Sequence, residues 1–272
     1  MKSITFATAL MLSIAAAHVC AQVKETGRKV EVEVPTFKSP EAALGWAKSQ
    51  IAAAQKVAPL QAREEFLMKA ASASQTAEAW RDASTEVRVE AALVGAEAFL
   101  GLSAPLNAQS AMARVRREDV RNTPLAAAFF ERAGEAAELR GDRRSAHVAY
   151  QTGLSASPSA DVRVLLLFRA GTNAFALTEY ERSAGLLEEA LANLPDGSAR
   201  ASIAEVDLGG AYARLKDRVR AEAWLHRATQ SLDRSSKGGS STTTGKDTFI
   251  PEPSSDELRK RISDVANSLR GL

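Results

Sequence analysis

The sequence predicts an all-α protein, a solenoid of antiparallel helix hairpins, and three observations support this fold class. Alanine, the best helix former and a poor strand former, supplies about a fifth of the 272 residues. From residue 39 to residue 234, apolar residues recur with helical spacing in successive segments of about 12 to 20 residues. The breaks between these segments are short, which favours antiparallel packing of neighbouring helices.

Composition and charge exclude several classes of protein. With 45% hydrophobic and 25% charged residues, the chain can bury a sizeable core, which excludes a mostly disordered protein. The 35 basic and 33 acidic residues give a net charge of +2, so the surface has no general attraction for nucleic acid. Beyond the N-terminal segment no stretch is long and apolar enough to span a bilayer, and no membrane span is expected.

Residues 1–21 are predicted to be a cleaved secretory signal peptide. Lys2 gives a positive start, a short apolar run follows, and small residues precede the expected cleavage after Ala21. We therefore expect an exported protein, periplasmic or secreted, whose mature chain contains no cysteine. The alternative is a lipoprotein signal in which the one cysteine, Cys20, carries the lipid.

Residues 22–38 are polar and are predicted to form an extended N-terminal arm. Val30, Val32 and Val34 alternate with charged residues, which is the spacing of a strand. Because a single strand is not stable alone, the arm either stays extended or adds to the sheet of a partner.

A helical domain is predicted for residues 39–234. Ser39, Pro40 and Glu41 supply an N-cap, a proline in the first turn and an acidic residue, which together start a helix well. The segment 39–84 is expected to form a helical pair that caps the N-terminal end. Breaks between helices are expected near Pro59, Ser84, Gly101 to Pro105, Asn122 to Pro124, Gly141-Asp142, Ser157 to Ser159, Thr178, Pro195 to Gly197 and Lys216-Asp217.

The C-terminal residues change in character. Residues 235–254 are rich in Gly, Ser and Thr and are predicted to be a flexible linker. Residues 255–272 are predicted to form an amphipathic helix, capped by Ser255 and Asp256. Its apolar stripe must be buried against another surface, and consists of Leu258, Ile262, Val265 and Leu269.

An internal repeat is the strongest pattern in the chain. Gly134, Gly171 and Gly209 are spaced 37 and 38 residues apart. A small residue follows each glycine at +12 and a large residue follows at +16, so that two helix backbones approach closely and the large side chain fills the space beside them. These pairs are Ala146 with Tyr150, Ser183 with Leu187, and Ala221 with Leu225. A decayed copy begins at Gly95, where Ala108 and Met112 fit after a one-residue insertion.

This pattern resembles the tetratricopeptide repeat (TPR) over about residues 120–234. The best matching segments are GEAAELRGDRRSAHVAY and LGGAYARLKDRVRAEAWLHRA. The period exceeds the usual 34 residues by three or four, which longer loops between repeats would absorb. The large residue expected four positions before the glycine is Phe130 and Leu167 in two copies but Glu205 in the third. The resemblance implies a TPR-like superhelix of three recognisable repeats and one decayed repeat.

In this family the first helices of successive repeats line a concave groove that holds a peptide or helix. The corresponding positions here are apolar or small, with one acidic rung. The candidate anchors are Phe99, Phe168 and Phe175, although core packing between repeats would explain the same residues. The candidate charge selectors are Glu131, Glu135 and Glu138. The implied ligand is an apolar segment that carries a basic residue or two.

The residues offer no catalytic or metal-binding constellation. His147 and His226 lie in second helices of different repeats and are expected to be surface or interhelical residues. No HExxH, GxSxG or Gly-rich phosphate loop occurs, so no enzyme activity, no metal and no cofactor are predicted. The basic cluster of residues 114–121 contains acidic residues and no aromatics, which indicates a solvated helix end and no nucleic-acid partner.

The sequence thus predicts a non-catalytic protein–protein interaction scaffold in the bacterial cell envelope. The alternative is an envelope-assembly accessory that binds a glycan or another non-protein ligand. The scattered Trp46, Trp80 and Trp224 argue against that alternative because glycan sites usually display exposed aromatic platforms. The C-terminal helix offers an intramolecular ligand, which either caps the last repeat or occupies the groove until a partner displaces it.

Overall fold

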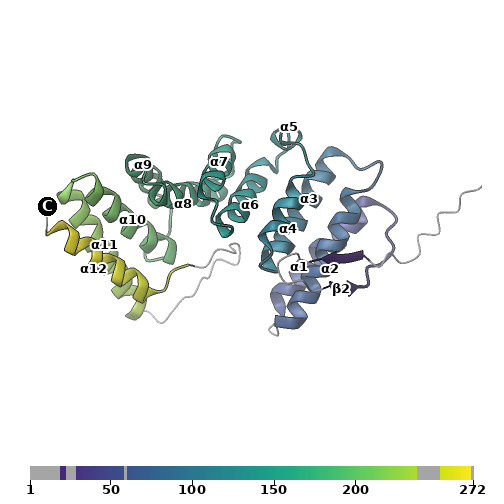
Figure 1. Ribbon diagram of the computed structural model, residues 1–272, viewed down its shortest axis with the longest axis horizontal. Coiled ribbons are helices and arrows are strands. Elements are labelled where there is room, and N and C mark those ends of the chain that lie inside the picture. Colours follow the sequence, from purple (N-terminus) through teal and green to yellow (C-terminus); the bar gives the residue numbers. More distant parts are fainter. Residues whose placement is uncertain (1–18, 23–28, 58–59, 238–251, 271–272) are drawn as a thin grey trace, which may run out of the picture.

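The computed structural model describes residues 19–22, 29–57, 60–237 and 252–270, and these form an arched stack of helices (Figure 1). The strands are β1 (Val19–Gln22) and β2 (Lys29–Val32). The helices are α1 (Pro40–Lys56), α2 (Leu60–Glu78), α3 (Thr85–Gly101), α4 (Pro105–Met112), α5 (Arg117–Arg121), α6 (Ala126–Leu139), α7 (Arg143–Leu154), α8 (Ala160–Ala176), α9 (Tyr180–Leu191), α10 (Ala199–Arg214), α11 (Arg218–Lys237) and α12 (Ser255–Leu269). The predicted all-α solenoid is confirmed.

The two short strands form an antiparallel pair that lies against α2. Val19 pairs with Val32. At the end of β2 and just beyond it, Val32 and Val34 are buried while Glu33 between them is exposed, which is the alternation that the sequence predicts. β1 crosses the predicted cleavage point after Ala21, whereas most of the predicted signal peptide, residues 1–18, lies outside the described residues.

Serine side chains cap the N-termini of several helices, and the cap predicted at Ser39 is one of them. The Ser39 and Ser84 hydroxyls accept the N–H groups of Ala42 and Val87, three residues further on. Two details were not predicted. The short α5 occupies part of the basic cluster, and α11 runs to Lys237, three residues into the predicted linker. Residues 238–251 of that linker lie outside the described part of the chain.

Close glycine contacts hold the three repeat hairpins α6–α7, α8–α9 and α10–α11 together. A Cβ atom on Gly134 would lie 2.2 Å from Cε1 of the buried Tyr150. A Cβ on Gly171 would lie 2.7 Å from Leu187, and one on Gly209 would lie 2.6 Å from Leu225. Each large residue therefore occupies the volume that a side chain at the glycine would need, as the repeat spacing predicts.

The turn inside each hairpin repeats a backbone feature. Seven residues after the repeat glycine, Gly141, Thr178 and Lys216 have φ values of 77°, 64° and 60°. Such left-handed residues end a helix tightly and suit glycine best. In the α3–α4 hairpin the left-handed residue is Ser103, eight positions after Gly95. The insertion expected in the decayed repeat therefore lies in this turn.

The first helices of the hairpins pack on one another along the array, from α3 to α6, α8 and α10. We call the surface that they present on the concave side of the arch the inner face (Figure 1). α8 and α10 meet where Phe175 approaches Gly210, whose Cβ would lie 2.9 Å from the phenyl Cζ. Such close contacts set the spacing of the repeats.

α12 packs on α10 and α11 at the end of the stack. Its N-cap is Ser254 and not the predicted Ser255 and Asp256, because Ser254 exchanges hydrogen bonds with Glu257 in a capping box. Arg261 pairs with Asp207 of α10, and further along both helices Val265 lies beside Gly210. Because these contacts advance in the same direction, α12 runs parallel to α10 and takes the place that the first helix of another repeat would have.

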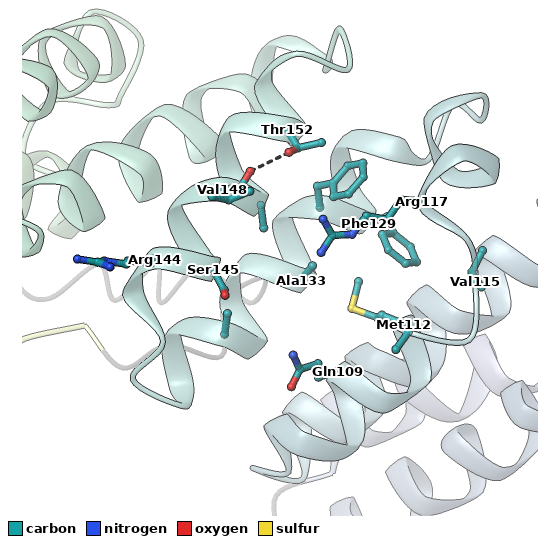
Figure 2. Close-up of a pocket in the computed structure, with 14 residues that line it drawn as sticks. Gln109, Met112, Val115, Arg117, Phe129, Ala133, Arg144, Ser145, Val148 and Thr152 are labelled. Carbon is teal, nitrogen blue, oxygen red and sulfur yellow. Dashed lines mark hydrogen bonds between the residues drawn. The ribbon is translucent and has the colours of Figure 1, made fainter.

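On the side away from the inner face, the α6–α7 hairpin borders a pocket of about 600 Å³ between α4, α6 and α7 (Figure 2). We call it the α4–α7 pocket. It opens where the decayed repeat meets the first regular one, on the side of α6 away from Glu131, Glu135 and Glu138. Phe129 and Ala133 of α6 form part of its wall, and Val148 of α7 lies at its rim.

Candidate functional site

The structure places the predicted anchors at different depths on the inner face. Phe99 and Phe168 each have 2% of their surface exposed, and each belongs to a hydrophobic core cluster. Phe175 is half-buried, with its ring 5.7 Å from the ring of Tyr180. Solvent therefore reaches part of Phe175, whereas Phe99 and Phe168 serve core packing in this structure.

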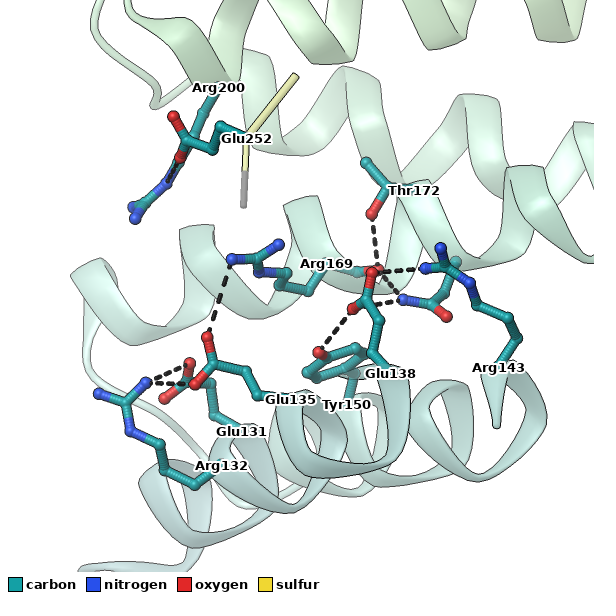
Figure 3. A network of polar contacts seen from close by, with 11 residues as sticks. Glu131, Arg132, Glu135, Glu138, Arg143, Tyr150, Arg169, Thr172, Arg200 and Glu252 are labelled. Carbon is teal, nitrogen blue, oxygen red and sulfur yellow. Dashed lines mark hydrogen bonds and ion pairs between the residues drawn. The ribbon is translucent and has the colours of Figure 1, made fainter. Parts of the chain in front are cut away.

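The three predicted charge selectors lie together on α6, and arginines already contact all of them (Figure 3). Arg132 donates to Glu135 at 2.6 Å and to Glu131 at 3.0 Å. Arg169 of α8 lies 3.7 Å from the other oxygen of Glu135, whose side chain is completely buried. This buried group of ion pairs joins the α6–α7 hairpin to the α8–α9 hairpin.

Glu138 connects three helices through its carboxylate. It accepts a hydrogen bond from the Tyr150 hydroxyl of α7 at 2.9 Å and one from the Asn173 amide of α8 at 3.0 Å, and it pairs with Arg143. Tyr150 is also the side chain that fills the space beside Gly134. The glycine contact and the polar contacts therefore depend on the same ring. We call these side chains the inner network: Glu131, Arg132, Glu135, Glu138, Arg143, Tyr150, Arg169 and Asn173.

Burial changes the protonation of this network. Loss of water raises the pKa of Glu131 to about 8, although the neighbouring Arg132 opposes the shift. Burial and the Glu138 charge raise the pKa of the Tyr150 hydroxyl well above its usual value. Burial thus favours the protonated form of Glu131, and since arginines contact all three glutamates, the acidic rung is not an open negative surface.

The arginines of the inner network were not singled out from the sequence, although a signal was present. Arg132, Arg169 and Asp207 each stand two residues before a repeat glycine. In the structure Arg132 pairs with Glu135 on the same helix, α6, and Arg169 of α8 pairs with Glu135 on the adjacent α6. Asp207 of α10 pairs with Arg261 of the adjacent α12. A charged residue that recurs at one buried repeat position indicates contacts between repeats.

In the α10–α11 repeat a buried ion pair occupies the position of the missing large apolar residue. Glu205 replaces the large apolar residue of the other copies and is 2% exposed. Its carboxylate forms an ion pair with Nε of Arg227 on α11, at 2.7 Å. Burial raises the pKa of Glu205, while Ser231 and Arg227 stabilise its charged form.

The described residues contain no group of three or more His, Cys, Asp or Glu side chains that could hold a metal ion. His147 is buried, and burial together with Arg182 lowers its pKa. His226 is exposed on α11, beside Gln230. The two histidines thus belong to different hairpins.

No helix in the described ranges is long and apolar enough to cross a membrane.

The tryptophans form no common platform. Trp46 packs against Phe37 near the start of the helical region, with ring centroids 5.7 Å apart. Trp224 lies on α11 near the other end, where the Arg227 guanidinium is 5.4 Å from its ring centroid. Both are half-buried, and Trp80 is also half-buried.

Comparison with solved structures identifies the architecture. The chain is similar to BtubC (BKLC) from P. vanneervenii, with a TM-score of 0.53 and 16% identity over 80% of this chain and 96% of that one. The TPR-like repeats of a Podosopora anserina protein named as a kinesin light chain give a TM-score of 0.55 and 15% identity, over 75% of this chain and 100% of that one. The fold is TPR-like.

No family model matches the sequence, and no curated protein matches it either. The TPR-like fold agrees with the resemblance carried by Gly134, Gly171 and Gly209. Since both identities are low, these similarities establish the fold, and the function has to be argued from this chain's own surfaces.

Proposed function

We propose that this chain is a non-catalytic protein-interaction scaffold that binds a peptide or helix of a partner protein on its inner face. The inner network supports the proposal because it fixes α6, α7 and α8 relative to one another through buried ion pairs and hydrogen bonds. A preformed face loses little ordering entropy when a partner docks. TPR-like repeat arrays offer surfaces of this kind.

Phe175 is the proposed centre of recognition. It is half-buried, it lies at the contact between α8 and α10, and Thr172 on the same helix is also half-buried. Because arginines already contact Glu131, Glu135 and Glu138, apolar contact at Phe175 carries more of the proposed recognition than charge does. The glutamates instead fix the helices of the inner face relative to one another. A basic residue of the partner would lie at the edge of the inner face.

Affinity capture from an envelope extract tests this proposal, with residues 22–272 as bait and mass spectrometry as the readout. A partner held by the wild-type bait should be lost with Phe175→Glu. Val219→Glu is the matched control because Val219 lies on α11 and is 79% exposed. Capture that is equal for all three baits contradicts recognition at Phe175. Circular dichroism verifies that each bait is folded.

The role proposed for α12 is that of a cap on the last hairpin. Its parallel course along α10 and its buried Leu258 and Leu269 support a cap, since an open end of a repeat array exposes apolar surface. A bait that ends at Lys237, the last residue of α11, separates the two roles of the tail. Loss of a cap should lower the melting temperature and cause aggregation, whereas loss of a groove occupant should strengthen partner capture.

Export to the periplasm or beyond is part of the same proposal. The N-terminal pattern that ends at Ala21 supports it, and the intact mass of the mature protein tests it. A mass that begins at Gln22 fits a cleaved signal, and a lipid-bearing mass that begins at Cys20 fits the lipoprotein alternative. Cleavage after Ala21 would remove three of the four residues of β1 and leave β2 with little of its pairing strand.

A further inference from the structure

The α4–α7 pocket differs in chemistry from the inner face. Its wall is mostly apolar, and Val148 in its rim has 56% of its surface exposed, which is unusual for a large apolar side chain. Its fourteen lining residues include two arginines and no acidic residue. The apolar members are Met112, Ala113, Val115, Phe129, Phe130, Ala133, Ala137, Val148 and Ala149.

The arginines stand at opposite ends of this pocket. Figure 2 shows Arg117 of α5 beside Phe129, and Arg144 of α7 at the far end. Both side chains are exposed, and neither forms an ion pair or hydrogen bond within the described residues. An arginine with no acidic partner at the edge of an apolar surface favours a negatively charged ligand group.

A second hollow extends the same surface over α7. It has a volume of about 510 Å³ and shares Val148 and Thr152 with the α4–α7 pocket. Its lining adds Arg121 and Arg182 and again contains no acidic residue. Arg121 is exposed and has no partner in the described ranges, whereas Arg182 contacts Glu179 at 3.2 Å. The α4–α7 pocket is thus the apolar part of a larger surface around Val148, and the second hollow adds polar and basic side chains to it.

From this arrangement we infer that the α4–α7 pocket is a second docking surface, which binds an acidic amphipathic helix of a partner protein. Apolar side chains of that helix fill the pocket beside Val148, and its carboxylates meet Arg117 and Arg144. Nucleic acid is a poorer occupant, because Phe129 and Phe130 are each 4% exposed and offer no free ring for base stacking. The ligand is thus opposite in charge to the segment expected on the inner face.

Selection of random peptides tests the inference without knowledge of the natural partner. Phage-displayed peptides of about 16 residues, enough for about four helical turns, are selected on the immobilised full chain. The expected peptides combine aliphatic or aromatic residues with several Asp or Glu. Their synthetic forms should bind the full chain in fluorescence anisotropy, and added salt should weaken the binding.

Substitutions place the binding on this surface. Val148→Glu should weaken the selected peptides at least about tenfold, and so should Arg117→Glu combined with Arg144→Glu, because each adds repulsion to an acidic ligand. Since these three side chains are exposed, the variants should fold normally. Val219→Glu adds the same charge to an exposed valine elsewhere and should leave binding unchanged.

Three results overturn the inference. The first is a selection that yields basic or uncharged peptides, or none that depends on Val148. The second is equal binding to wild type and to the Arg117→Glu, Arg144→Glu variant. The third is binding of a single-stranded oligonucleotide that needs the same arginines while acidic peptides do not bind. Dependence on Phe175 but not on Val148 assigns the peptides to the inner face and leaves only the proposed function supported.

Discussion

The inner and outer sides of the α6–α7 hairpin carry similar residues with different partners. Arg143 pairs with Glu138 in the inner network, whereas the next residue, Arg144, is one of the residues that line the α4–α7 pocket and has no partner among the described residues. On the adjacent α8, Phe175 is half-buried on the inner face, whereas Val148 of α7 is exposed on the outer side. Charge on the inner side holds the repeats together, and charge on the outer side remains available to a ligand.

The difference follows from burial. A charge that is taken out of water needs a partner, because its desolvation is otherwise uncompensated. The buried Glu135 therefore has two arginines around it, while an exposed arginine such as Arg144 keeps its hydration and can stay unpaired. Substitutions on the two sides should consequently act on different quantities, stability on the inner side and binding on the outer side.

Gly134→Ala should have the largest effect, because it attacks the hairpin that carries both sides. The new Cβ would overlap Tyr150, which is held by packing and by its bond to Glu138, so the free energy of unfolding should fall by about 3 kcal/mol. Urea denaturation measures the change. Gly45→Ala is the control, because a Cβ there has no atom within 4 Å and alanine suits the helix better, by about 1 kcal/mol. Equal losses in both variants would contradict the packing argument.

Arg132→Ala and Arg144→Ala compare the two sides directly. Loss of Arg132 leaves Glu135 buried with only Arg169 nearby, and should lower the free energy of unfolding by about 2 kcal/mol. Loss of Arg144 should change it by less than about 0.5 kcal/mol. Thermal and urea denaturation of both variants measure the difference. If the two variants lose equal stability, the inner arginine is not structural.

Glu131→Gln should reveal the protonated carboxyl through the pH dependence of stability. The folded pKa of about 8 lies above the unfolded value of about 4.5, so the contribution of Glu131 is fully present below pH 4.5 and is lost as pH rises through 8. The glutamine variant lacks this dependence. Relative to wild type, the free energy of unfolding of this variant should therefore rise steadily between pH 4.5 and 8. A constant difference over this range would show that Glu131 ionises normally.

Lys216→Gly should have a small effect and should leave both sides of α6–α7 unchanged. Lys216 has a left-handed φ of 60°, so glycine relieves strain there while it makes the unfolded chain more flexible, and the net gain should be at most about 1 kcal/mol. Gly141→Ala is the reverse test in an equivalent turn, with φ of 77°, and should cost about 1 kcal/mol. Matched signs in the two variants would argue against a shared turn geometry.

The sequence predicts the hairpins well because their determinants are local. Gly134, Tyr150 and the left-handed Gly141 follow one another at fixed offsets, and caps such as Ser84 stand directly before the helices that they start. Even the inserted residue of the decayed repeat was visible from the offsets of Ala108 and Met112. Patterns of this kind depend on neighbours within one hairpin.

The candidate site could be predicted only in part, because its state depends on other repeats. The position of Glu135 on the inner side follows from its offset from Gly134, but its pairing with Arg169 depends on the angle between two hairpins. The burial of Phe168 likewise depends on how neighbouring hairpins pack on one another. The α4–α7 pocket needs three helices from two hairpins, and Val148 by itself resembles any apolar residue of a helix.

The position of α12 has a consequence for the length of the molecule. The chain closes its stack with half a layer, a first helix without a second, and this half layer recognises Asp207 of α10 through Arg261. Whole hairpins can therefore be gained or lost ahead of α10 by duplication or deletion without disturbing the seal. The partner charge of α12 lies in the last hairpin alone, since the equivalent position of the preceding hairpin is Arg169. The Arg261–Asp207 pair thus ties α12 to the α10–α11 hairpin and to no other hairpin of the array.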